Sequence, residues 1–266
     1  MCGVLLHPAG HTRSPAMHRA AYDALGIDAV YLAFDVPPER LEDAIRGARA
    51  LGARQISVSL PHKEAVLPLL DAVDETARRI GAVNTIVRTG ERLVGHNTDW
   101  LGAVQAIERE RSLGGARAVV LGAGGAARGV VFGLLERGAH VTVLNRTADR
   151  AHALARALGA HGSGSLDEIG SIGFDVLVNT TSVGLRSDES PVPAAAIAAG
   201  ALVMDAVYEP QRTRLLRDAQ ARGARTLGGK WMLVLQAAEQ LRLWTGREAP
   251  LDVMAAAFDR ASPYPP

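Results

Sequence analysis

Cysteine, lysine and long apolar runs are all scarce in this sequence of 266 residues. Its single cysteine, Cys2, excludes an intramolecular disulfide and a cysteine cluster for a metal, and we interpret it as incidental at a frayed terminus. No stretch of about 18 apolar residues occurs, which argues against a transmembrane helix. The apolar N-terminal run is too short for a signal peptide and lacks its basic start. We therefore expect a cytoplasmic protein without a membrane partner.

Excess charge of either sign is also missing. The formal net charge is +1, and basic and acidic residues are interspersed along the chain. Because a nucleic-acid-binding face needs clustered basic residues, we expect no nucleic-acid partner. A hydrophobic content of 48% is ample for real cores, and the length exceeds that of one typical domain. Monomer and homodimer both remain open.

Lysine occurs only at Lys63 and Lys230, and all other members of the 29 Lys and Arg residues are arginines. A lysine ammonium can release and recover a proton, whereas a guanidinium stays charged. Lys63, inside VSLPHKE (58–64), is therefore a candidate for proton transfer. A solvated charge at the start of a helix is the simpler alternative.

Helical and β-prone segments alternate along the chain. The pattern GAR or GAH recurs at 52–54, 115–117, 138–140 and 223–225, and a short β-prone run follows each time. Glycine just past a helix end, followed by an apolar strand, is typical of alternating α and β units. The recurrence has no fixed period. We predict a layered α/β fold and not a solenoid.

The two halves of the chain differ in pattern. Residues 1–99 predict strands and helices in alternation, with a helical stretch after the strand QISVSL and then a β-ribbon at 85–96. A helix at 99–111 follows and is expected to act as the linker. Residues 117–230 predict a βαβ series, and an apolar helix at 231–244 comes near the end.

The segment VVLGAGGAARG (119–129) predicts a strand, a glycine turn and a helix, and the strand HVTVLN follows it. Gly122, Gly124 and Ala127 match the G-x-G-x-x-G/A spacing that lets a helix N-terminus approach a pyrophosphate. We predict dinucleotide binding; a chance glycine-rich turn is the alternative. The candidate cofactor-binding residues of this turn are Gly122, Ala123, Gly124, Gly125 and Ala126.

The end of the second strand of this unit selects the cofactor. An NAD site places an acidic residue there, whereas this chain has Asn145, Arg146 and Thr147, with Arg150 one turn later. Two guanidinium groups and a hydroxyl suit a 2′-phosphate, so we predict NADP. A routine helix N-cap with surface arginines would have a similar sequence.

Polar residues gather at predicted strand ends in the first half, in HTRSP (11–15), SVSLPHK (57–63), GAVNT (81–85) and GHNTD (95–99). Such ends are where α/β proteins assemble ligand sites. Each segment alone could be an ordinary turn or cap. Together they predict a ligand site.

These segments, followed in order by GAGGA, NRT, NTTSVGL and QAAEQ, resemble the shikimate dehydrogenase family over nearly the whole chain. The resemblance implies an α/β substrate domain (1–99 with 236–266) and a Rossmann NADP-binding domain (100–235), with the C-terminal helix returning to the first domain. It also implies reversible, NADP-dependent reduction of 3-dehydroshikimate to shikimate, a step of aromatic amino acid biosynthesis in the chorismate pathway.

The resemblance further implies roles for individual residues. Lys63 and Asp99 correspond to the catalytic pair of the family, and Gly229 to a contact with the nicotinamide end of NADP; no metal is implied. Hydride transfer needs a group that takes or returns the hydroxyl proton, which a lysine beside a carboxylate can do. The residues implied to contact the substrate are Thr12, Ser14, Ser59, Asn84, Tyr208 and Gln236.

Several positions depart from the pattern of the family. Thr12 replaces a serine, Ser57 an asparagine and Ser59 a threonine, and Lys230-Trp231 replaces an apolar-Gly pair. Changes of one methyl or hydroxyl alter selectivity more than reaction type. A dehydrogenase of quinate or aminoshikimate, and a non-catalytic NADP-binding sensor, therefore stay open as alternatives. We expect Trp231 to be a core residue because it opens an apolar helix.

Overall fold

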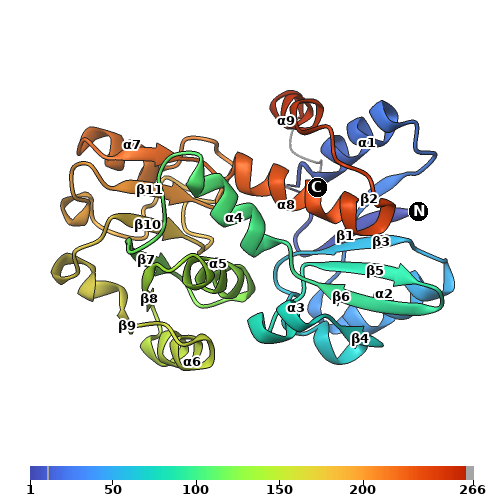
Figure 1. Cartoon of the computed structure of the whole chain (residues 1–266), viewed down its shortest axis with the longest axis horizontal. Helices are drawn as coiled ribbons and strands as arrows, with labels where there is room; N and C mark the ends of the chain where they lie inside the picture. The colour runs from blue at the N-terminus through green and yellow to red at the C-terminus, as the bar shows by residue number, and fades with distance from the viewer. Residues whose placement is uncertain (11, 262–266) are drawn as a thin grey trace. The chain divides into compact units, whose positions relative to one another are not determined.

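The computed structural model describes residues 1–10 and 12–261, and the chain forms two compact units. Unit 1 comprises Met1–Asp99 and Val234–Pro266, and unit 2 comprises Trp100–Leu233. Each unit contains its own six-stranded sheet, and Figure 1 labels most of the strands and helices. The first residue of the predicted HTRSP turn, His11, lies outside the described residues.

The sheet of unit 1 consists of β1 (Cys2–Leu6), β2 (Tyr31–Asp35), β3 (Gln55–Val58), β4 (Ala72–Val73), β5 (Thr85–Thr89) and β6 (Arg92–His96). Its strand order is β2-β1-β3-β5-β6-β4. Strands β1, β2 and β3 are parallel, whereas β5 runs antiparallel to both of its neighbours, β3 and β6. The carboxyl ends of β3 and β6 therefore lie at the same sheet edge as the start of β5.

The helices of unit 1 supply apolar faces to this sheet. In α2 the buried residues are Leu41, Ile45 and Ala48, which recur at helical spacing and share a core cluster with Ile56 and Val58 of β3. The unit contains α1 (Ser14–Leu25), α2 (Leu41–Ala50), α3 (Glu75–Ile80), the part of α8 (Lys230–Thr245) from Val234 onward, α9 (Leu251–Arg260), and the 3-10 turns η1 (Pro38–Arg40) and η2 (Leu67–Leu69).

The sheet of unit 2 consists of β7 (Arg117–Leu121), β8 (His140–Asn145), β9 (Gly162–Ser165), β10 (Val176–Asn179), β11 (Leu202–Asp205) and β12 (Arg225–Leu227). Its order is β12-β11-β10-β7-β8-β9, and every neighbouring pair is parallel. This is the doubly wound Rossmann order, in which the direction of winding switches between β7 and β10. Ligands of such sheets bind beyond the carboxyl ends of the strands at that switch.

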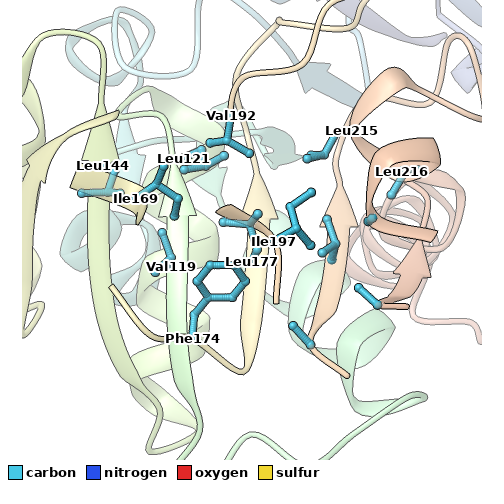
Figure 2. Packing of buried hydrophobic residues seen from close by; sticks show 14 residues of the cluster. Val119, Leu121, Leu144, Ile169, Phe174, Leu177, Val192, Ile197, Leu215 and Leu216 are labelled. Atoms are coloured by element: carbon cyan, nitrogen blue, oxygen red, sulfur yellow. The ribbon is translucent and has the colours of Figure 1, made fainter. Parts of the chain in front are cut away.

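Apolar side chains from strands and helical segments of unit 2 pack together against its sheet. Figure 2 shows one cluster, in which Val119 and Leu121 of β7 and Leu177 of β10 pack with Phe174 and Leu215. Val119 and Leu121 are two residues apart and so share one face of the sheet. The unit contains most of α4 (Asp99–Glu108), α5 (Gly125–Glu136), α6 (Ala148–Leu158), α7 (Arg214–Ala221), and the 3-10 turns η3 (Leu166–Ser171) and η4 (Ala194–Ala196).

The structure confirms the predicted α/β class, the β-ribbon at 85–96 and the βαβ series, and corrects two details. Cys2 is buried inside β1 and is not part of a frayed end. The stretch after β3 is not one helix: the 3-10 turn η2 ends at Leu69, the backbone is extended at Leu70, and α3 begins only at Glu75. None of the helices in the described part of the chain is long and apolar enough to cross a membrane.

One histidine is enclosed in the core of unit 1. His18, on α1, has no exposed surface, and its ring stacks on that of Tyr31 with centroids 4.1 Å apart. Burial lowers the pKa of His18 to about 3. The folded protein therefore keeps this ring neutral at pH values where the unfolded chain would protonate it.

His18 should make the fold sensitive to acid. Its pKa is lower in the folded state, so its contribution to stability is present above about pH 6.5 and is lost as the pH falls toward about 3. The full loss is on the order of 5 kcal/mol in free energy of unfolding. Denaturant unfolding of His18→Phe between pH 7 and pH 4 should show a shallower loss than the wild type. The exposed His140→Gln is the control, and parallel pH curves for wild type and His18→Phe would contradict the prediction.

Candidate active site

Four polar side chains of unit 1 meet at one edge of its sheet. Lys63 follows β3, Asn84 immediately precedes β5, Asp99 follows β6 as the first residue of α4, and Gln236 lies on α8. Because β5 is antiparallel to β3 and β6, its start lies beside their ends. Chain direction alone thus brings residues from three separate sequence segments to the same place.

Lys63 and Asp99 form an ion pair. The Nζ of Lys63 donates to Oδ2 of Asp99 at 2.6 Å, and the two side chains are only 15% and 6% exposed. Charges attract more strongly away from water, but a buried pair is stable only when further hydrogen bonds satisfy it. The second carboxylate oxygen has such a bond, because Oδ1 of Asp99 accepts from Nδ2 of Asn84 at 2.8 Å.

The backbone fixes the orientation of the Asn84 amide. The N–H of Thr98 donates to Oδ1 of Asn84 at 2.7 Å, and an N–H cannot accept, so that atom must be the oxygen. The Nδ2 group then faces Asp99 and also donates to Oε1 of Gln236 at 3.2 Å. Asn84, Asp99 and Gln236 are all nearly fully buried. The amide therefore holds the carboxylate that in turn holds Lys63.

The other predicted substrate residues of unit 1 are not joined to these four. Thr12 and Ser14 are buried where α1 begins, and Oγ1 of Thr12 accepts from the N–H of Ser14 at 3.3 Å. Ser59 directly follows β3, and its N–H donates to the carbonyl of Leu5 on β1. Within residues 1–10 and 12–261, none of the three has a side-chain bond to the Lys63–Asp99 pair.

Sequence reasoning missed Thr98 and Gln240. The side chain of Gln240 accepts from Oγ of Ser57 at 2.7 Å and donates to the carbonyl of Asn84 at 3.3 Å. It follows Gln236 by one helical turn, and this i, i+4 spacing is a signal that could have identified it. Thr98 bonds Asn84 through its backbone N–H and through its Oγ1, which accepts from Nδ2 of Asn84 at 3.0 Å. The backbone bond cannot be predicted from residue type.

In unit 2 the glycine turn lies between β7 and α5. Gly122 has φ of +109°, and a Cβ there would approach Oγ1 of Thr180 to 2.7 Å. Helix α5 begins at Gly125, and its N-cap, Gly124, supplies no side-chain cap. Its first N–H groups are therefore available to an anion, as a dinucleotide pyrophosphate requires.

At the end of β8, the predicted 2′-phosphate residues are exposed. Neither Arg146 nor Arg150 has a side-chain partner in the part of the chain that the structure describes, and Thr147 accepts no capping bond from α6. The Nδ2 of Asn145 donates to the carbonyl of Thr147 at 3.0 Å and shapes the turn. A donor set of two unpaired guanidinium groups without an acidic residue fits NADP.

Tyr208 and Gly229 line a cavity of about 300 Å³ in unit 2. A Cβ at Gly229 would lie 2.4 Å from the carbonyl oxygen of Ala206, so only glycine fits there. Trp231 also lines this cavity; it is only partly buried, and the Arg109 guanidinium lies 3.9 Å from its ring centroid. Our expectation of a core position for Trp231 was therefore wrong. Among the described residues, no three His, Cys, Asp or Glu side chains gather into a metal site.

Together the two units define a two-part α/β protein with a Rossmann-type unit and a separate unit that presents a buried Lys–Asp pair. Three family models match the chain. They describe the shikimate dehydrogenase substrate binding domain (residues 4–86), shikimate / quinate 5-dehydrogenase (104–184) and the shikimate 5′-dehydrogenase C-terminal domain (229–257). The chain belongs to the shikimate dehydrogenase family.

Individual relatives match nearly the full length. Shikimate dehydrogenase (NADP(+)) of Thermococcus kodakarensis is 50% identical over 250 residues, which cover 92% of this chain and 90% of the relative. The crystal structure of shikimate 5-dehydrogenase from Thermus thermophilus with NADP(H) and shikimate is 41% identical, with a TM-score of 0.91 and coverage of 98% and 99%. Quinate dehydrogenase from Corynebacterium glutamicum with NAD is 32% identical, with a TM-score of 0.87 and 98% coverage of both chains.

The arginines after β8 lead to a prediction about cofactor choice. Arg146→Ala should weaken NADP binding by about tenfold or more and NAD binding little, because a charge-assisted phosphate bond contributes roughly 1.5 to 3 kcal/mol. Titration calorimetry with each cofactor measures both constants. Arg156→Ala, an exposed change on α6, the helix that follows Arg146, is the matched control. An equal loss for both cofactors would remove the assignment of this turn to the 2′-phosphate.

Proposed function

We propose that this enzyme interconverts 3-dehydroshikimate and shikimate, with NADP as its cofactor. The observation that carries the proposal is the 2.6 Å pair between Lys63 and Asp99, in a chain that uses arginine at nearly every other basic position. Membership of the family and the NADP(H) and shikimate in the Thermus thermophilus relative support the substrate and the cofactor.

Proton transfer is the task we assign to Lys63. Bound NADP supplies the acceptor for the hydride that leaves the substrate carbinol carbon, and NADPH the donor in the opposite direction. In ketone reduction the Lys63 ammonium gives a proton from Nζ to the oxygen and becomes a neutral amine. In the oxidation direction that neutral amine takes the hydroxyl proton as the hydride leaves. Asp99 keeps Nζ in place and balances its charge, while Asn84 fixes the rotation of the Asp99 carboxylate.

Binding is divided between the units. The residues that we assign to the polyhydroxy acid are Thr12, Ser14, Ser59, Asn84, Tyr208 and Gln236. We assign residues 1–99 with 236–266 to substrate binding and 100–235 to NADP binding, through the glycine turn, Asn145, Arg146, Thr147, Arg150 and Gly229. We place the enzyme in the cytoplasm, and its single cysteine supports this location. We assign it no nucleic-acid partner, which its balanced charge supports. We propose that it is a monomer or a homodimer.

The test of the function is a spectrophotometric panel at 340 nm with shikimate, quinate and a plain 2-hydroxy acid, each with NADP and with NAD. We expect the highest kcat/KM for shikimate with NADP. A higher kcat/KM for quinate than for shikimate would instead identify the enzyme as a quinate dehydrogenase. No turnover of any substrate, with NADP still bound, would contradict the assignment as an enzyme and favour an NADP-binding sensor.

The role of Lys63 can be separated from its charge. Lys63→Arg keeps a positive charge but cannot release a proton, so its kcat should fall nearly as far as that of Lys63→Ala, by about 10²- to 10⁴-fold. KM should change much less, because the lost interaction belongs to the transition state. Near-wild-type turnover of Lys63→Arg would show that charge suffices.

Asp99→Asn controls for the larger size of arginine. This variant keeps the size of the side chain at position 99 and removes the negative charge beside Nζ. We expect kcat to fall and one limb of the pH profile of kcat to move relative to the wild type. A pH profile identical to that of the wild type would indicate that Asp99 is not coupled to the proton transfer.

A further inference from the structure

A second buried carboxylate lies at the carboxyl end of β11 in unit 2. Asp205 has no exposed surface and, in the part of the chain that the structure describes, no ion pair. A buried charge without a cation is costly and must be held by hydrogen bonds. Asp205 accepts three, from Nδ2 of Asn179 (2.9 Å), the N–H of Val207 (3.0 Å) and Oγ1 of Thr213 (2.6 Å).

Two of these bonds hold the two ends of one segment. Val207 lies near the start of the segment 206–213 and Thr213 at its end, where Thr213 is also the N-cap of α7. Tyr208, to which we assign a substrate contact, lies between them. The Asp205 carboxylate therefore bonds both ends of the segment that contains Tyr208.

The third bond connects this segment to the neighbouring loop. Asn179 ends β10, and its Oδ1 accepts from both the N–H and the hydroxyl of Thr181. The residue between them, Thr180, donates from Oγ1 to the carbonyl of Leu121 at 2.6 Å and lies against Gly122 of the glycine turn. Asp205 thus links the Tyr208 segment to the loop that borders the cofactor turn.

The backbone around Asp205 also supports the cavity lined by Tyr208 and Gly229. A Cβ at Gly229 would come within 2.4 Å of the carbonyl oxygen of Ala206 and 3.1 Å of that of Asp205. Gly229 therefore packs directly on this backbone. A shift of residues 205–207 would move the wall that carries Tyr208.

Burial raises the pKa of Asp205 to about 6, although the hydrogen bonds from Thr213, Val207 and Asn179 oppose the change. Near neutral pH the carboxylate is charged and accepts all three bonds. Groups with perturbed protonation equilibria concentrate at functional sites, and this one lies at the ligand-binding end of a Rossmann sheet.

We propose that Asp205 is a positioning residue for the reaction: its carboxylate fixes the 206–213 segment so that Tyr208 meets the substrate in one orientation. The proposal rests on the proposed function for its kinetic part. It assigns no contact between Asp205 and the substrate or NADP, and the effect of Asp205 passes through Val207 and Thr213.

The kinetic test is Asp205→Asn at neutral pH, which removes the charge and one acceptor at constant size. We expect the KM for shikimate to rise about tenfold, with kcat changed less than about threefold, because Tyr208 binds substrate and does not transfer the proton. Asp175→Asn is the matched control; this carboxylate lies just before β10, at the opposite end of the sheet, where it holds the N–H and guanidinium of Arg117. An Asp205→Asn enzyme with the KM of the wild type would overturn the proposal.

A second pair of variants guards against a folding defect at position 205. Thr213→Val removes the hydroxyl that reaches Asp205, and Thr213→Ser restores it. Thr213→Val should raise KM in the same way, and Thr213→Ser should recover it. If both variants shared the same raised KM, the hydroxyl bond would not be the cause and the proposal would be wrong.

Hydrogen exchange separates this inference from the proposed function. In the free protein, the backbone amides of 206–213 should exchange faster in Asp205→Asn than in the wild type or Asp175→Asn. This readout needs no substrate, so it remains informative even if the enzyme fails to oxidise shikimate, a failure that would count against the proposed function alone. Unchanged protection of 206–213 would show that Asp205 does not hold the segment.

Discussion

The hydrogen bond from the N–H of Thr98 to Oδ1 of Asn84 is the constraint on which the candidate catalytic pair depends. Because a backbone donor occupies the oxygen side of the amide, Asn84 must present its NH₂ group to Asp99 and Gln236. The carboxylate is then oriented on one side by an amide and on the other by Lys63. A flexible lysine side chain is thus positioned by rigid backbone, through two intermediates.

Asp99 and Asp205 are the carboxylates buried within the described part of the chain, and they are stabilised in different ways. Asp99 is buried beside the Lys63 ammonium, and we propose that this pair exchanges a proton with a bound hydroxyl group. Asp205 accepts hydrogen bonds from neutral donors only, and we infer that it positions the 206–213 segment and takes no part in proton transfer. In both cases the carboxylate lies where a strand ends: Asp205 is the last residue of β11, and Asp99 comes shortly after β6. Beyond such ends, backbone N–H groups no longer pair with a neighbouring strand and can bond to side chains.

The sequence was informative where function depends on residue type. The scarcity of lysine made Lys63 a candidate for proton transfer, and the glycine spacing predicted a dinucleotide-binding turn before α5. The alternating pattern predicted the α/β class. It failed where the cause is geometric. The sequence does not predict that the Thr98 backbone orients Asn84, or that Trp231 lies beside a cavity instead of in the core. Both facts depend on how segments that are distant in the sequence pack together.

Gly122 and Gly229 have no room for a side chain unless their surroundings shift. Every missense change in a glycine codon adds at least a Cβ, and at Gly122 and Gly229 that atom would lie 2.7 Å from Oγ1 of Thr180 and 2.4 Å from the carbonyl oxygen of Ala206. The obstacle at Gly229 is backbone, which no side-chain rotation can remove. Even alanine, one nucleotide away in the genetic code, does not fit at Gly229, so a lineage that depends on the cavity lined by Tyr208 and Gly229 has no gradual route away from glycine there.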